Sequence, residues 1–231
     1  MKIAFLSDIH GNLSALDAVI ETPIFKECEQ FFFLGDFIGY YFEPKKVLDR
    51  LRGLEFEFVL GNHEELLLQN RNYPEGMQYL TEKYGIGHSI AVDELSEEDF
   101  EWLKDIPRSR TIEVNGFEIV LCHGFFNDCD MHVYPDTNLI NLVDAMPPRV
   151  RYIFMGNTHY PMNRSIGGVK FINPGSVGQP RNGQKGASWG YFDTVSETFS
   201  NIYTHYDQES VAKQAEIRDP IHHYLAEVLR R

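Results

Sequence analysis

Short apolar runs recur along the first three quarters of the chain, and a polar cluster follows each of them. The runs read KIAFL, QFFFL, FEFVL, FEIVL, RYIFM and VKFIN. Runs of this length that end in Gly, Asp, Asn or His are typical of buried strands. Because ligands collect at the carboxyl ends of strands in α/β sheets, we expect the six polar clusters to face one crevice.

Helical periodicity separates some of these strands. Apolar residues at helical spacing lie between the first two runs, at Leu13, Leu16, Val19 and Ile20. Residues 45–51 form the next predicted helix, with Pro44 in its first turn. The chain therefore begins as a strand–helix–strand unit of an α/β fold.

Residues 64–110 interrupt this alternation. A helical pattern opens the segment, its middle is rich in tyrosine, and Ser96 begins a capping box for a second helix. We expect a small helical insertion over the sheet at about residues 64–110. With 231 residues and 43% hydrophobic content, residues 1–231 suit a single domain with this insertion.

The last quarter of the chain predicts a hairpin and a helix. The segments ASWGYFDT and TFSNIYTHY alternate in polarity, as an antiparallel hairpin does. A final helix is expected to start at Asp219 and Pro220, as N-cap and first helical residue. Its predicted apolar stripe consists of Ile221, Tyr224, Leu225 and Val228.

Composition narrows the possible partners. The 21 basic and 34 acidic side chains give a formal charge of −13, which repels a phosphate backbone, so nucleic-acid binding is not expected. No apolar run reaches membrane-spanning length and the first residues lack a signal-peptide pattern, so we expect no membrane association and a cytoplasmic location. The three cysteines are an odd number and lack CxxC spacing, so we expect reduced thiols and not a disulfide framework.

Candidate metal ligands follow five successive strands. Asp8 and His10 lie two positions apart after the first strand, so both can face one cation. The later strand ends contribute Asp36, then Asn62 and His63, then His123, then Asn157 and His159. Each residue alone is explained as a helix cap, a turn residue or a packed histidine. Five such strand ends together exceed what capping requires and favour a metal site.

The ordered motifs SDIHGN, GDFIGY, GNHE, CHG and NTH, followed by NPGSVGQPR, resemble those of the calcineurin-like metallophosphoesterases. The resemblance is specifically to the small single-domain prokaryotic phosphodiesterase branch. It implies a four-layer α-β-β-α sandwich of two mixed sheets. It also implies a two-metal centre at the strand ends.

The resemblance further implies a ligand set: Asp8, His10 and His159 for the first metal, Asp36 as the bridge, and Asn62 and His123 for the second metal. Carboxylate, imidazole and amide donors suit two divalent or trivalent ions, with Mn or Fe preferred and Zn next. A hydroxide bridging the ions is the implied nucleophile. His63 is then expected to protonate the leaving alkoxide or to stabilise the phosphoryl oxygens.

Asn157 departs from the family pattern. Family members commonly carry histidine at this position, so Asn157 replaces a ligand of the second metal. Its neutral amide oxygen would weaken that site, shift it toward Mn²⁺ or Mg²⁺, or leave it vacant. Asn157 could coordinate through this oxygen or hold only a water. His132 could fill the gap, although a surface loop histidine is the simpler interpretation.

Three further residues are candidates for substrate binding. Asn12 could contact a phosphate or serve as a helix N-cap. Tyr40 could stack on a leaving group or pack against the insertion. Arg181 has planar donors that suit phosphate oxygens, with a solvent-exposed loop arginine as the alternative.

The leading functional hypothesis is metal-dependent hydrolysis of a small phosphorylated molecule, with phosphodiesters or nucleotides preferred. Phosphomonoesterase activity, including protein phosphatase activity, is the close alternative. A non-catalytic metal-binding scaffold is an alternative of another class, and only Asn157 favours it. A nuclease is disfavoured by the charge, and the sequence leaves a homodimer open.

Overall fold

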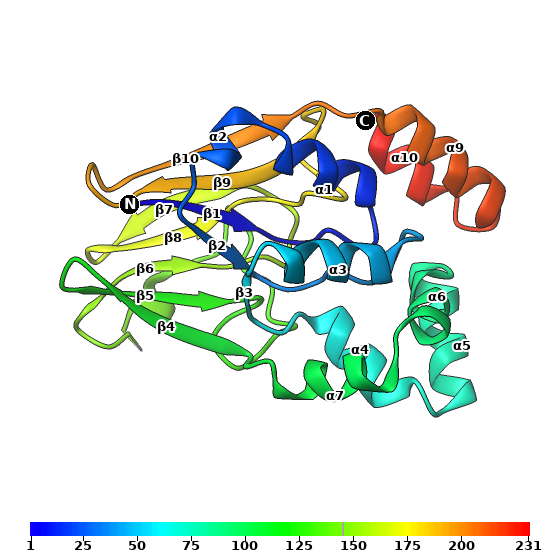
Figure 1. Ribbon diagram of the computed structural model, residues 1–231. Helices are drawn as coiled ribbons and strands as arrows, with labels where there is room; N and C mark the ends of the chain where they lie inside the picture. Colours follow the sequence, from blue (N-terminus) through cyan, green and yellow to red (C-terminus); the bar gives the residue numbers. More distant parts are fainter. Residues whose placement is uncertain (145) are drawn as a thin grey trace.

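The computed structural model describes residues 1–144 and 146–231 and consists of two five-stranded sheets stacked face to face (Figure 1). The first sheet has the order β10-β9-β1-β2-β3 and the second the order β4-β5-β6-β8-β7. Each contains parallel and antiparallel pairs, so both sheets are mixed. The predicted α/β class and the two mixed sheets are confirmed.

The strands of the first sheet are β1 (Lys2–Leu6), β2 (Gln30–Phe33), β3 (Glu57–Phe58), β9 (Ala187–Asp193) and β10 (Thr198–Thr204). The strands of the second are β4 (Ser109–Val114), β5 (Phe117–Cys122), β6 (Val150–Phe154), β7 (Met162–Ile166) and β8 (Val169–Asn173). The six predicted strands and the C-terminal hairpin are all present. Strands β4 and β7 are additional, and each pairs antiparallel with the strand beside it.

The core between the sheets positions the two sets of strand ends. Phe5 of β1 stacks on Phe154 of β6, with ring centroids 3.7 Å apart and planes tilted by only 6°. Burial of such large rings is a main source of folding free energy. Because this packing fixes the sheets against each other, β1, β2, β5 and β6 all end on the same side of the molecule (Figure 1).

Two outer layers cover the sheets. Helices α1 (Leu13–Ile20), α2 (Pro23–Lys26) and α3 (Pro44–Gly53) pack on the first sheet, where Leu16 and Leu48 share a buried cluster with Phe33. The outer face of the second sheet is covered by a loop segment containing Val133 and the short helix α8 (Ile140–Val143). The predicted four layers are therefore present, with a thin fourth layer.

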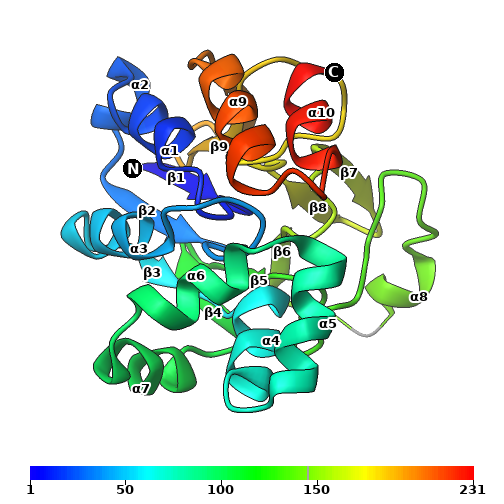
Figure 2. The same cartoon turned by 90° about the vertical axis from the view of Figure 1, so that its right-hand side faces the viewer.

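Four helices lie between β3 and β4, where the insertion was predicted: α4 (Asn62–Asn70), α5 (Pro74–Tyr84), α6 (Gly87–Glu94) and α7 (Glu97–Asp105). They gather beyond the strand ends (Figure 2). The predicted capping box is confirmed, because the Ser96 hydroxyl accepts the Asp99 N–H and the Asp99 carboxylate accepts the Ser96 N–H. In the described ranges, no helix is long and apolar enough to traverse a membrane.

The chain ends in α9 (Gln208–Arg218) and α10 (Tyr224–Arg230). The predicted start of the last helix is wrong: Asp219 caps the end of α9, and Ile221 is 82% exposed and outside the helix. The Asp219 carboxylate accepts the Ile86 N–H and binds the His222 ring, so it does not cap α10. Leu225 and Val228 are buried as predicted.

Candidate metal centre and active site

The loops after the strands bring the predicted site residues together. Asp8 and His10 follow β1, Asp36 follows β2, Asn62 and His63 begin α4, His123 follows β5, and Asn157 and His159 follow β6. All eight side chains are buried. Segments far apart in the sequence therefore place two carboxylates, two carboxamides and four imidazoles around one centre.

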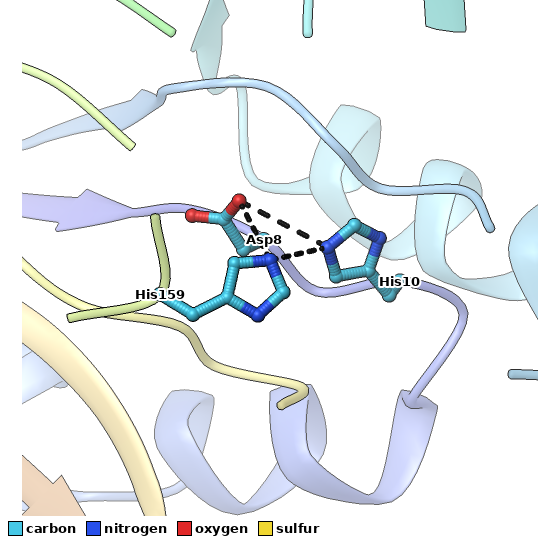
Figure 3. A group of neighbouring side chains, drawn as sticks. All are labelled: Asp8, His10 and His159. Atoms are coloured by element: carbon cyan, nitrogen blue, oxygen red, sulfur yellow. Dashed lines mark hydrogen bonds and ion pairs between the residues drawn. The ribbon is translucent and has the colours of Figure 1, made fainter. Parts of the chain in front are cut away.

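Three overlapping groups of ligand atoms lie within 4.8 Å of one another: Asp8 with His10 and His159, Asp8 with Asp36 and His123, and His10 with Asp36 and His63. Figure 3 shows the first group, which matches the predicted ligands of one metal. The second group contains two predicted ligands of the other metal. The third includes His63, which was expected to act on the substrate.

Three of the imidazoles are oriented by the backbone. The Nδ1 atoms of His10, His123 and His159 lie 2.8, 2.5 and 2.9 Å from the carbonyl oxygens of Ile38, Leu34 and Gln179. Because a carbonyl only accepts, each Nδ1 carries a hydrogen. Burial lowers the pKa of His10 and of His159 well below the usual value, so in these two rings Nε2 carries a lone pair. Metal-binding histidines are anchored in this way.

These lone pairs meet at close range. The Nε2 atoms of His10 and His159 are 3.0 Å apart. Two acceptors at this distance repel each other unless a cation or an added proton lies beside them. The arrangement therefore fits a divalent cation held by nitrogen and oxygen donors.

Asp36 lies between the groups. Its Oδ1 accepts the backbone N–H of His63 at 2.9 Å. Its Oδ2 lies 3.2 Å from His123 Nε2 and 3.7 Å from His10 Nε2. Burial would raise the pKa of Asp36, but the charge of His123 and hydrogen bonds from the His123 ring and the His63 backbone N–H hold it below its usual value. One carboxylate oxygen thus faces histidines of two different groups.

Asp8 has a buried oxygen that is left free. Its Oδ1 accepts the Asn157 N–H at 3.2 Å and lies 3.4 Å from His159 Nε2. Its Oδ2 has no hydrogen-bond partner among the described residues. Burial raises the pKa of Asp8 to about 7. A buried carboxylate oxygen without a partner is costly, and a bound cation would satisfy it.

The carboxylates already stabilise one positive charge at this position. Burial opposes protonation of His123, but Asp36 and Asp8 raise the pKa of His123 to about 10. The two carboxylates thus favour a positive charge beside them. The same carboxylates would stabilise a metal ion, so the donor set fits the cations that the sequence predicts.

The two asparagines differ in how their amides are held at this centre. Asn62 Oδ1 lies 3.1 Å from His123 Nε2, while its amide nitrogen donates to Asp130. The amide nitrogen of Asn157 donates to the carbonyls of Cys129 and Met131. Asn157 also lines the cavity beside the centre, and the hydrogen bonds of its amide nitrogen leave its oxygen without a donor among the described residues.

His132 lines the cavity beside Asn157. Its Nδ1 bonds to the carbonyl of Asp130, and its ring stacks on Tyr134. It belongs to none of the three ligand groups found among the described residues. His132 is exposed in a loop at the cavity, and its role stays a prediction.

The backbone at the site is held in an unusual conformation. Ten non-glycine residues in the described ranges have positive φ, and six belong to the site: Asp8 (54°), His10 (53°), Asp36 (65°), Tyr40 (56°), Asn157 (67°) and His159 (62°). Such conformations cost about 1–3 kcal/mol each and concentrate at functional sites. Hydrogen bonds between neighbouring loops hold them, including Asp8 N–H to Gly35 O at 3.0 Å.

His63 is held by ring contacts rather than by hydrogen bonds. Its ring stacks on His88 with centroids 4.9 Å apart, and its Nδ1 has no partner among the described residues. Its Nε2 lies 3.9 Å from Asp36 Oδ2. Burial lowers the pKa of His63 well below its usual range and that of His88 to about 4. Sequence reasoning missed His88, since a lone histidine in a helix carries no signal.

Glu64 is a second residue that sequence reasoning missed, although it ends the GNHE motif. Its carboxylate accepts four backbone N–H groups, from Asp36, Phe37, Ile38 and Gly61, at 2.8–3.2 Å. Burial, together with the charge of Asp36, raises the pKa of Glu64 to about 7. Glu64 therefore fixes the loop that carries Asp36.

The variant Glu64→Gln is expected to lower the free energy of unfolding by about 3 kcal/mol. The amide nitrogen of the new side chain would face backbone N–H donors, and the hydrogen bonds that the carboxylate accepts there would be lost. Urea denaturation measures this loss. The matched control is Glu65→Gln, since Glu65 pairs with Arg108 nearer the surface. Equal stability of the two variants would show that Glu64 does not hold the loop.

The site opens into a cavity of about 220 Å³. Tyr40 and Arg181 line it, and an Arg181 guanidinium nitrogen lies 3.2 Å from the Tyr40 hydroxyl. Asn12 does not line it: its oxygen caps α1 at Ala15, and its nitrogen donates to Gly178 and Tyr206. The structure thus brings two of the three predicted substrate-binding residues to the cavity and places Asn12 as the N-cap.

Comparison with known proteins agrees with this architecture. An uncharacterized protein of Methanocaldococcus jannaschii is 29% identical over 226 residues, covering 89% of this chain and 88% of that protein. The crystal structure of a hypothetical protein from Pyrococcus horikoshii has a TM-score of 0.84 at 20% identity, covering 99% and 97% of the two chains. A metallophosphoesterase from Sphaerobacter thermophilus has a TM-score of 0.79 at 22% identity, covering 100% and 99%.

The family assignment comes from the sequence match. The model of the calcineurin-like phosphoesterase superfamily domain matches residues 1–197. This range contains every strand of both sheets except β10, and every residue of the centre described above. The chain therefore belongs to the calcineurin-like phosphoesterase superfamily.

Proposed function

We propose that this protein hydrolyses small phosphoesters, with phosphodiesters or nucleotides preferred, at a centre that holds two metal ions. The observation that carries the proposal is the set of three backbone-anchored imidazoles whose Nε2 atoms converge on Asp8 and Asp36. A non-catalytic metal-binding scaffold would need the same ligands, but it would have no chemical need for His63 beside them.

The proposed ligands of one ion are Asp8, His10 and His159, and those of the other are Asn62, His123 and the Asn157 oxygen, with Asp36 shared. We propose Mn or Fe as the preferred metals and Zn as the next. Two such ions, when bound, supply the positive charge that activates water and stabilises a phosphoryl group.

The chain itself would orient the substrate. His63 lies beside Asp36 at the cavity and is proposed to act on the leaving oxygen, with its ring fixed by His88. Arg181, steadied by Tyr40, is proposed to bind phosphoryl oxygens. The cavity of about 220 Å³ has room for a phosphoryl group and for the first atoms of its substituents.

The test compares hydrolysis of bis-p-nitrophenyl phosphate and mono-p-nitrophenyl phosphate by protein loaded with Mn²⁺. The expected result is faster turnover of the diester, and loss of both activities when the metal is removed by a chelator. Faster turnover of the monoester would replace the proposal by a phosphomonoesterase. No hydrolysis of either compound by metal-loaded protein would favour the scaffold.

Asn157→His is expected to tighten the second metal site toward Zn²⁺, because imidazole nitrogen is a softer donor than an amide oxygen. The expected gain in Zn²⁺ affinity is about tenfold or more, the size of effect that metal-site substitutions produce. Titration of metal-free protein with Mn²⁺ and Zn²⁺ reads the two sites separately. Unchanged affinities at both sites would exclude Asn157 from the coordination shell.

A further inference from the structure

A second cavity adjoins the site cavity. It has a volume of about 320 Å³ and is lined by α4 and α5, which lie side by side in Figure 2. Asn62, Lys83, Tyr84 and Asp130 line both cavities. The two therefore share a wall, and a substrate that fills the first can extend along α4 and α5 into the second. We call the second cavity the α4–α5 groove.

Lys83 is placed at the junction without a carboxylate partner. Its ammonium nitrogen lies 4.8 Å from the centroid of the Tyr84 ring and 5.7 Å from that of Tyr79. Within the described parts of the chain, no carboxylate forms an ion pair with it. In a protein with a formal charge of −13, a cation left unpaired in a cavity is free to bind an anion.

The site cavity contains one other cation, Arg181, which also forms no ion pair among the described residues. Aromatic rings connect the two: Arg181 contacts Tyr40, and the Tyr40 and Tyr84 rings meet edge to face at 5.7 Å. His63 packs against both tyrosines, at 4.9 and 4.6 Å. His63 thus lies between the tyrosine that contacts Arg181 and the tyrosine that contacts Lys83.

Arg181 is the cation already proposed to bind the phosphoryl group that reacts. Lys83 is then available to bind a second negative charge on the substrate, on the side of the α4–α5 groove. The groove also offers a surface for a planar ring, because Tyr79 lines it and is 54% exposed. The amide of Gln69 lines it too and can bond to polar ring edges.

We propose that the leaving group of the natural substrate is a nucleotide, whose own phosphate binds Lys83 and whose base lies on Tyr79 in the α4–α5 groove. This inference rests on the proposed phosphodiesterase function and deepens it. In the reaction, the oxygen of a water bonds to phosphorus and the bond from phosphorus to the sugar oxygen breaks. That oxygen keeps the electron pair and takes a proton supplied through His63, while the proton of the water goes to solvent.

The experiment compares two substrates that differ by one phosphate: the deoxydinucleotide dApdA and its 5′-phosphorylated form pdApdA. Wild-type protein loaded with Mn²⁺ is expected to show a kcat/KM about tenfold or more higher for pdApdA, the effect of one charge-assisted contact. Lys83→Met should reduce this ratio to near one. The control Lys185→Met removes an exposed, unpaired charge that lines neither cavity, and should keep the ratio.

A binding measurement supports the kinetic one. AMP should inhibit hydrolysis of bis-p-nitrophenyl phosphate competitively and about tenfold more strongly than adenosine, and Lys83→Met should remove the difference. Pyrophosphate has no base, so comparing it with AMP distinguishes binding of the base from binding of the phosphate. Tyr79→Leu should weaken inhibition by AMP and leave inhibition by pyrophosphate unchanged.

The outcomes distinguish the inference from the proposed function. Wild-type hydrolysis of bis-p-nitrophenyl phosphate with equal kcat/KM for the two dinucleotides would retain the function and overturn the nucleotide assignment. A preference for pdApdA that survives Lys83→Met would overturn the assignment of Lys83. Absence of hydrolysis of every diester would overturn the proposed function itself.

Discussion

Replacing Asp36 with alanine is expected to reduce kcat/KM for bis-p-nitrophenyl phosphate by about 10³-fold or more, the range seen when a group that stabilises transition-state charge is removed. Asp36 Oδ2 faces His123 and His10, which belong to different ligand groups. Its loss would leave the proposed cations without their shared negative charge. The measurement pairs kinetics with the metal content of the purified variant.

The matched control is Asp36→Asn. Its amide oxygen can still accept the His63 N–H that Asp36 Oδ1 accepts, so the start of α4 should remain in place while the charge is lost. Asn and Ala variants that are equally inactive would assign the loss to the charge. An Ala variant with full metal content and near wild-type turnover would contradict the bridging role of Asp36.

Replacing His63 with alanine is expected to leave the metals bound and to slow turnover of substrates with poor leaving groups by about 10²–10⁴-fold, the range for general acid catalysis. Burial keeps the ring neutral in the free protein, and a phosphoryl group beside it would raise the pKa of His63. Nitrophenolate is a good leaving group that departs as an anion and needs no proton from a general acid. The loss on bis-p-nitrophenyl phosphate should therefore be much smaller than on diphenyl phosphate.

His205→Ala provides the control, since His205 is exposed and does not line the site cavity. It should leave both rates unchanged. An equal loss on the two substrates for His63→Ala would assign His63 to charge stabilisation instead of proton transfer. Loss of bound metal would instead make His63 a ligand, as its group with His10 and Asp36 allows.

The strands that carry the site could be predicted because their signals are local. An apolar run followed within two residues by Asp, Asn or His identifies both the buried strand and a candidate ligand, as at Asp8 and His123. Strands β4 and β7 escaped prediction because their residues are mostly half-exposed or exposed, and pairing with β5 and β8 supplies the stability. Their stability depends on contacts that local periodicity does not encode.

The features that escaped prediction at the site depend on contacts between distant segments. The Tyr41 hydroxyl donates to the carbonyl of Leu225, so the C-terminal helices hold the loop after Asp36. Likewise, His10 N–H bonds to Asp36 O, which locks the left-handed turn of one loop against the next. Such interlocking arises only after the sheets have formed, so no short sequence pattern reports it.

The central claim is that the cluster around Asp8, His10, Asp36, His123 and His159 holds two metal ions. The most direct test is anomalous diffraction at the Mn absorption edge from crystals grown with Mn²⁺. The expected result is two peaks, one bound by Asp8, His10 and His159 and the other by Asn62 and His123, with Asp36 contacting both. Active protein whose Mn²⁺ peaks lie away from these side chains, or that shows none, would contradict the claim.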